Sequence, residues 1–221
     1  EISSDLPVKE RRLIFPILKK GFLQSDFDIK TRSIETIAVL GKKAIPFLLD
    51  LAKETQGTLN EGMVAQLLSE HSPVETLLNL TRDGKSSWKI RRAGYEGLKV
   101  HKSNLESEDY QGSLENLPEI EEGILYFEGL ESIQKLVKSL NGKMTQMQLQ
   151  KLTDESARVG LDAVPFLIEA FNSKVPKARG RASSILVEIG QEAVPALKTA
   201  SRTGGDKEIY WAELTLKKIG K

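Results

Sequence analysis

Residues 189–197 read Ile-Gly-Gln-Glu-Ala-Val-Pro-Ala-Leu, and this stretch decides the fold because the chain repeats it. Residues 159–167 (Val-Gly-Leu-Asp-Ala-Val-Pro-Phe-Leu) and 40–48 (Leu-Gly-Lys-Lys-Ala-Ile-Pro-Phe-Leu) are near copies. The prolines of the first two copies are 30 residues apart, and Pro46 of the third lies 119 residues before Pro165, close to four such periods. A fixed period of this length is typical of stacked helical repeats.

Each 30-residue unit predicts two helices. The first begins beside the proline, which is tolerated in a first helical turn because its missing N–H has no helical partner there. The second ends at the glycine, which supplies a left-handed residue. More diverged copies include Pro16 and have register points at Glu70 and Gly129, whereas the unit near residue 100 has no good match. The expected turns after the first helices are Gly21, Gly57, Gly84, Asn141-Gly142, Asn172-Ser173 and Gly204-Gly205.

Composition favours helices and excludes several chemistries. The 221 residues include 30 Leu against 11 Val, two His and no Cys. The absence of cysteine excludes disulfides, thiolate metal sites and cysteine nucleophiles. His71 and His101 are one repeat apart, too distant for a shared metal ion. We therefore expect no catalytic residues, no metal and no cofactor, and no apolar run is long enough for a membrane span.

The motif Ile-Gly-x-x-Ala-Val-Pro-x-Leu, with a basic residue opening the second helix, resembles the HEAT-like repeats first described in phycobilin lyases. The resemblance is strongest over residues 30–50 and 158–221 and poor over 103–134. It implies an all-α fold, an α-solenoid (superhelix) of about seven antiparallel helix pairs, with residues 1–221 forming a single repeat domain. Such repeats serve mostly as protein-binding scaffolds, and the fold alone does not specify a function.

One position per repeat, nine residues before each register point, is mostly basic and can be interpreted in two ways. It can form a cationic stripe for an acidic partner. The resemblance instead favours a ladder in which each arginine bridges to an acidic residue of a neighbouring turn, such as Asp28 or Asp206. The residues at this position are Arg32, Glu61, Arg91, Ile120, Lys151, Arg181 and Trp211.

Basic and aromatic side chains alternate at the start of the helix expected near residue 88. Trp88, Arg91, Arg92 and Tyr95 have the residue types that hold phosphates and stack bases. They resemble the DNA-binding surface of alkylpurine DNA glycosylases, which are also built from HEAT-like repeats. The alternative is an ordinary second helix in which Trp88 packs against the next repeat.

The near-neutral charge hides a strong asymmetry. Segment 103–134 carries nine acidic residues and no Lys or Arg, so the rest of the chain has 32 basic residues against 22 acidic ones, a net charge of +10. We expect an acidic irregular insertion, or degenerate repeat, at about 103–134. Two roles are open for it: a functional loop that covers the basic remainder, or a solvated surface insertion.

These patterns predict a non-enzymatic scaffold that binds a protein partner through the concave face formed by its second helices. The alternative is a nucleic-acid-binding protein similar to alkylpurine DNA glycosylases, and a lyase activity would rest on the resemblance alone. A monomer is favoured. The chain begins at Glu1 rather than Met, which fits either a cytoplasmic or an exported protein. The candidate binding residues are Arg32, Trp88, Arg91, Arg92, Tyr95, Lys151, Arg181 and Trp211.

Overall fold

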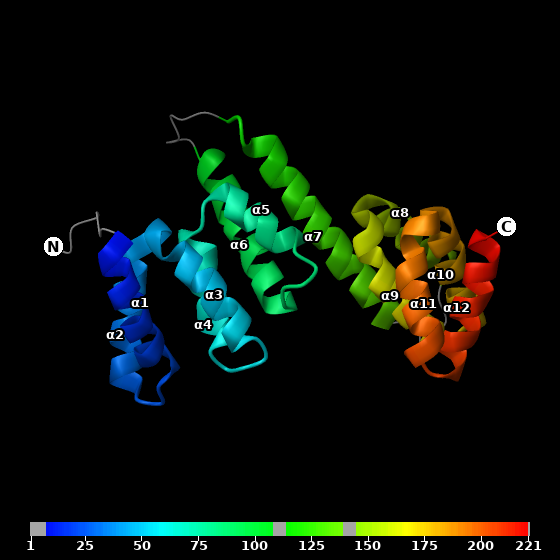
Figure 1. Ribbon diagram of the computed structural model, residues 1–221. Helices are drawn as coiled ribbons and strands as arrows, with labels where there is room; N and C mark the ends of the chain where they lie inside the picture. The colour runs from blue at the N-terminus through cyan, green and yellow to red at the C-terminus, as the bar shows by residue number, and fades with distance from the viewer. Residues whose placement is uncertain (1–7, 108–113, 139–144, 221) are drawn as a thin grey trace. The chain divides into compact units, whose positions relative to one another are not determined.

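The computed structural model describes residues 8–107, 114–138 and 145–220, and every regular element in these ranges is helical. The all-α prediction is therefore confirmed (Figure 1). Within these ranges no helix has both the length and the apolar character needed to cross a bilayer. The α-helices are α1 (Val8–Leu23), α2 (Phe27–Leu40), α3 (Ile45–Thr55), α4 (Glu61–His71), α5 (Val74–Arg82), α6 (Trp88–Leu105), α7 (Leu117–Lys138), α8 (Gln146–Val159), α9 (Val164–Glu169), α10 (Pro176–Ile189), α11 (Val194–Thr203) and α12 (Asp206–Ile219).

The repeated motif forms the same corner three times. The helices α2, α8 and α10 each end at a glycine with positive φ: Gly41 at 51°, Gly160 at 61° and Gly190 at 76°. A 3₁₀ turn follows each glycine, and the next helix then begins with a proline in its first turn. The corners are thus formed by glycine and proline at the predicted positions. The glycines have ψ values of −130°, −130° and −137°, however, so they lie outside the left-handed helical region that the sequence predicts for them.

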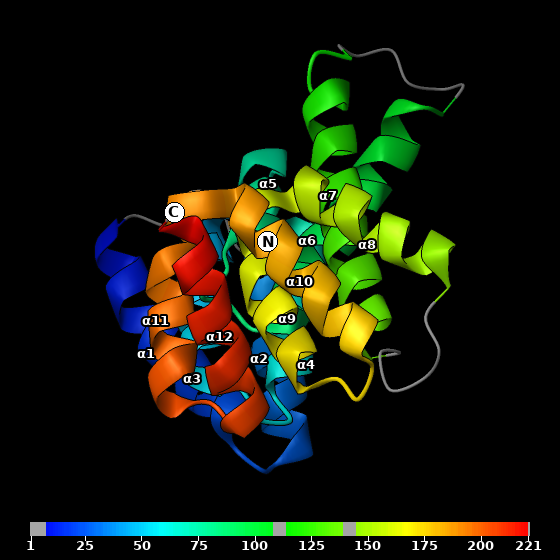
Figure 2. The same ribbon diagram turned by 90° about the vertical axis from the view of Figure 1, so that its right-hand side faces the viewer.

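The helices pack in two compact units, residues 1–124 and 125–221. In the first unit, α1 packs on α2, α3 on α4, and α6 on both α4 and α5. Leu48, Leu51 and Leu68 are among the fully buried side chains of its core. In the second unit, α10 packs against α8, α9 and α12, and α11 packs against α12 (Figure 2). Leu167, Phe171 and Leu186 are fully buried there.

Helix α1 differs from the sequence prediction at its proline and at its glycine. Helix α1 begins at Val8, so Pro16 lies inside it rather than at its start, and Gly21 lies in its last turn rather than in a loop. Pro16 is exposed, and it lacks the N–H that another residue would donate within the helix. Gly21 is instead a contact point, because a Cβ there would overlap the hydroxyl of Ser33 on α2.

The middle of the chain is more regular than expected. No corner occurs near residue 100, and α6 continues to Leu105. Of segment 103–134, residues 117–134 belong to α7, which also runs through the supposed helix end at Gly129. Ile120, Phe127 and Ile133 of α7 are fully buried, so packing stabilises this helix in spite of its acidic residues. Residues 108–113 of this segment, and the expected turn at 141–142, lie outside the described residues.

Candidate binding surface

Four polar contacts within the two units join residues that lie about 30 positions apart in the sequence. The separations of 28 to 32 residues are close to the 30-residue period of the sequence motif. The contacts are Lys30 Nζ to Asn60 Oδ1 (3.0 Å), Lys89 Nζ to Glu61 Oε2 (3.6 Å), Arg181 Nε to Thr153 Oγ1 (2.8 Å) and Ser183 Oγ to Thr215 Oγ1 (2.8 Å).

Two arginines of the predicted column take part in packing. Arg91 is 6% exposed, and its Nε donates a hydrogen bond to the carbonyl of Thr81, at 3.0 Å. Its charge also contributes to lowering the pKa of Asp83, for which the main cause is the hydrogen bond donated by Ser86. Arg181 is half-buried and donates to the hydroxyl of Thr153 rather than to the carboxylate that the ladder interpretation expected.

The other members of the column do not share one environment. Glu61 and Ile120 are buried, whereas Arg32 and Lys151 are exposed and form no ion pair with any described residue. Trp211 is half-buried: its ring lies 6.2 Å from that of Phe171, and the guanidinium of Arg179 lies 5.9 Å from the Trp211 ring centroid. The column is therefore not a uniform cationic stripe.

The basic and aromatic cluster on α6 is only partly accessible. Tyr95 is buried, and Trp88 is half-buried with the Arg91 guanidinium 5.8 Å from its ring centroid. Arg92 is exposed, and its Nε lies 3.6 Å from Glu96 Oε1 one helical turn away. Helix α6 thus directs two of the four residues into the protein, which leaves less surface for bases and phosphates than the sequence suggested.

A groove between α4 and α6 brings Arg92 into a candidate binding surface. The groove has a volume of about 360 Å³. Small residues form its floor, namely Gly62, Ala65, Ser69 and Ala93, and Gln66, Glu70, Lys89, Arg92 and Glu96 also line it. Sequence reasoning missed the groove, although the small residues of α4 recur at the spacing of one helical face.

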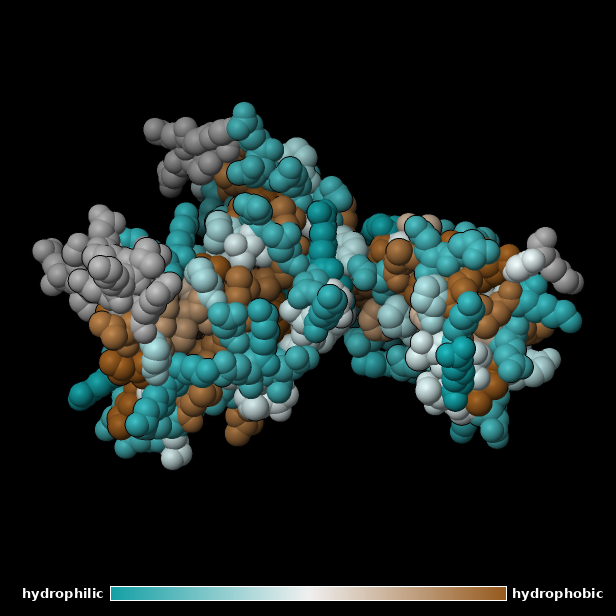
Figure 3. Space-filling view, viewed as in Figure 1, coloured by the Kyte–Doolittle hydropathy of each residue, from teal (hydrophilic) through white to brown (hydrophobic). Residues whose placement is uncertain are grey.

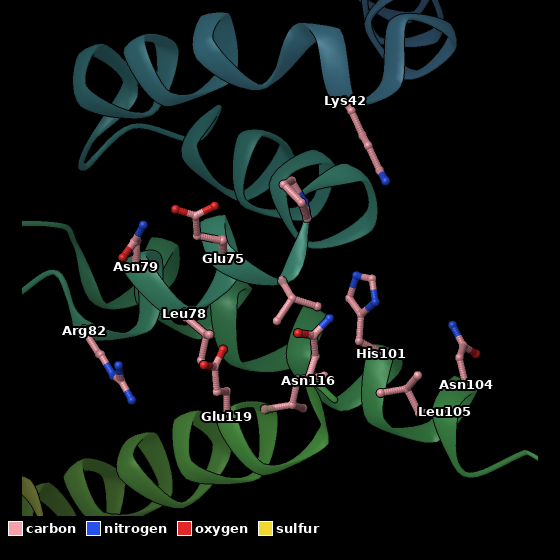
Figure 4. A pocket seen from close by; sticks show the side chains of 13 residues that line it. Lys42, Glu75, Leu78, Asn79, Arg82, His101, Asn104, Leu105, Asn116 and Glu119 are labelled. Carbon is pink, nitrogen blue, oxygen red and sulfur yellow. The ribbon is translucent and has the colours of Figure 1, made fainter. Parts of the chain in front are cut away.

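A second pocket of the first unit lies beside α5. It measures about 820 Å³ and is bordered by α5, the last turns of α6, and the residues at the start of α7 (Figure 4). Apolar and polar residues mix in its lining, among them Leu78, Asn79, His101 and Glu119. Of these residues, only Glu119 belongs to a part of the chain, the acidic segment 103–134, for which the sequence suggests a functional role.

Acidic residues of α7 pair with basic residues of α5 and α6. Arg82 Nη2 lies 2.9 Å from Glu122 Oε1, and Lys102 Nζ lies 2.8 Å from Glu121 Oε1. The hydrogen bond from Lys102 to Glu121 is the main cause that raises the pKa of the lysine. Part of the acidic segment therefore forms ion pairs with basic residues of the rest of the chain.

Apolar side chains are exposed on the first helix pair. Leu13 and Ile17 on α1 are 70% and 71% exposed, and Phe27 on α2 is 78% exposed. Brown, hydrophobic side chains are visible over α1 and α2 in Figure 3. Leu13 and Ile17 are four residues apart and thus share a helix face, which distinguishes them from the core positions Leu18 and Phe22.

The two histidines make separate local contacts. His101 Nε2 lies 3.4 Å from the carbonyl oxygen of Ser72, and His71 Nε2 lies 3.9 Å from Glu70 Oε2. Within the described part of the chain, no three His, Asp or Glu side chains lie close enough to hold a metal ion.

Neither a comparison with models of known protein families nor a search of the curated proteins finds a match for this chain.

Proposed function

We propose that this protein is a non-enzymatic scaffold of HEAT-like helix pairs that binds a protein partner through the exposed face of its second helices. In this proposal the helix pairs are the repeats of an α-solenoid, with about seven repeats as the sequence period predicts. The partner lies in the groove between α4 and α6.

The observation that carries the proposal is the small-residue floor of this groove. A Cβ added to Gly62 would meet no atom within 4 Å, so the space above α4 is open. Arg92 and Glu96 provide charges of both signs at the groove, with side chains that are 54% and 44% exposed. Protein interfaces commonly combine a closely packed centre with a polar rim.

The nucleic-acid alternative has less support. Two residues of its aromatic and basic cluster, Tyr95 and Arg91, are buried in the first unit and so are not accessible to a nucleic acid. The remaining exposed cation, Arg92, lies beside a carboxylate. Binding to phosphates requires cations that are accessible and unscreened.

The test is photo-crosslinking in cells that express the protein. A photoreactive phenylalanine analogue replaces Gln66, which lines the groove, or Lys198, an exposed residue of α11. We expect a defined protein adduct from position 66 and none of the same mass from position 198. Gly62→Trp fills the groove and should abolish the adduct.

Gly180→Trp is the matched control, because Gly180 also lies within a helix and a Cβ there would also meet no atom within 4 Å. This variant should leave the adduct intact. The proposal is wrong if no protein is crosslinked from position 66, if Gly62→Trp leaves the adduct unchanged, or if the crosslinked species is a nucleic acid.

A further inference from the structure

The pocket beside α5 has an apolar floor. Leu78 and Ile120 are 9% and 0% exposed, and they belong to a small core cluster in which α5, α6 and α7 meet. Val74 and Leu105 pack against this cluster and also line the pocket. An apolar side chain that enters the pocket would therefore lose contact with water on several sides.

Three asparagines surround this floor and come from different segments. Asn79 lies on α5, Asn104 on α6, and Asn116 just before α7, so that they are spread across the pocket (Figure 4). All three are exposed, and none donates a side-chain hydrogen bond to, or accepts one from, another described residue. A carboxamide both donates and accepts hydrogen bonds, as does a peptide group. The three amides are therefore suited to bind the main chain of an extended peptide.

The charges of the pocket favour a cationic occupant. Glu75 and Glu119 are exposed and have no ion-pair partner among the described residues, whereas Arg82 is neutralised by Glu122 at 2.9 Å. In Figure 4, Glu75 and Glu119 lie toward the Asn79 side of the pocket, while Lys42 lies on the side of His101. The Asn79 side thus has uncompensated negative charge.

We infer that this pocket binds a short extended peptide segment of another protein, with an apolar side chain on the floor and an adjacent lysine or arginine between Glu75 and Glu119. The volume of about 820 Å³ lies within the usual range of ligand-binding clefts. The inference goes beyond the proposed function, because the pocket is separate from the groove between α4 and α6. Either site can exist without the other.

The test uses a displayed library of random 12-residue peptides selected on the immobilised protein. We expect the selected sequences to be enriched in an apolar residue next to Lys or Arg. The double variant Glu75→Lys with Glu119→Lys should bind these peptides about tenfold more weakly. A new selection on this variant should enrich Asp or Glu in place of the cation.

The control double variant is Glu35→Lys with Glu213→Lys, which makes the same change of net charge at two exposed positions outside the pocket. It should bind the original peptides with unchanged affinity. A second variant, Leu78→Asn, should weaken binding without altering the preference for a cation.

Three results would overturn the inference: no enriched peptide, enrichment of acidic peptides on the unmodified protein, or equal losses in the pocket and control variants. None of these results would affect the crosslinking from position 66, so failure of the pocket and failure of the groove can be distinguished.

Discussion

Gly94 on α6 lies directly against the main chain of Leu77 on α5: a Cβ at Gly94 would come within 2.6 Å of the Leu77 carbonyl oxygen and 2.9 Å of the Thr81 nitrogen. The two helices can pack this closely only because residue 94 has no side chain. Since both obstacles are main-chain atoms, a rotamer change cannot relieve them.

Gly94→Ala should therefore destabilise the protein by about 2 kcal/mol, the usual cost of overpacking. Gly62→Ala is the matched change at an open helical position, and it should stabilise by up to about 1 kcal/mol through helix propensity alone. Urea unfolding monitored by circular dichroism measures both effects. Equal effects of the two substitutions would contradict the close approach of α5 and α6.

Gly190 should resist replacement by any other residue. Its backbone lies at φ 76° and ψ −137°, a region that is essentially restricted to glycine and differs from the left-handed helical region that asparagine tolerates. Gly190→Ala and Gly190→Asn should each cost about 1–2 kcal/mol. Gly180→Ala in the same helix is the control and should not destabilise. If Gly190→Asn were clearly more stable than Gly190→Ala, the backbone at this corner would have a different conformation from the one described.

The ionised carboxylate of Asp83 should stabilise the folded protein, and this contribution should disappear in acid as the group becomes protonated. Ser86 Oγ donates to its carboxylate at 2.7 Å, and the backbone N–H of Lys85 donates at 3.0 Å, so the pKa lies below the usual 3.8. A carboxyl group whose pKa is lowered by folding adds stability above pH 3.8, and this contribution is lost as the pH falls through the lower, folded-state value.

Asp83→Asn should accordingly lower stability at pH 7 by less than about 1 kcal/mol, because the group is exposed and screened. It should also reduce the slope of stability against pH below 3.8. Asp50→Asn is a control, since its exposed carboxylate is paired, among the residues that the structure describes, only with Lys53, which is also exposed. Chemical denaturation between pH 2 and pH 7 makes the comparison. An unchanged slope in Asp83→Asn would contradict the assigned hydrogen bonds.

Arg91 and Arg92 are neighbours in sequence but should respond differently to replacement by lysine. Arg91→Lys removes the buried Nε donor of the Thr81 carbonyl and should cost about 2 kcal/mol. Arg92→Lys keeps the charge of an exposed pair and should change stability by no more than about 0.5 kcal/mol. Thermal unfolding of the two variants tests the difference. Similar melting temperatures would indicate that Arg91 is a surface residue.

The sequence predicted the corners because they depend on local conformation. Gly41, Gly160 and Gly190 are each followed by a proline at the same spacing. In each pair the glycine adopts a positive φ at the end of one helix, and the proline lies in the first turn of the next. Local requirements of this kind are visible in one chain without homologues.

Other features depend on contacts between helices and were therefore missed. In the sequence, Gly21 and Gly129 resemble residues that end a helix. Each instead lies within a helix at a point of close packing, Gly21 against Ser33 and Gly129 against Val159. The acidic residues of α7 concealed its buried side chains, among them Ile120, Phe127 and Ile133. The groove and the pocket each combine residues from distant parts of the sequence, so spacing alone did not reveal them.

The corners have a consequence for how such a chain can lengthen. Residues 160–189 begin with one corner glycine and are followed by another, and Gly160 and Gly190 have nearly the same backbone conformation. A tandem duplication of this segment would therefore create a junction that the protein already contains, without a new loop to optimise. Recombination at these glycines gives evolution, or a protein engineer, a way to add thirty residues in frame while preserving every local turn.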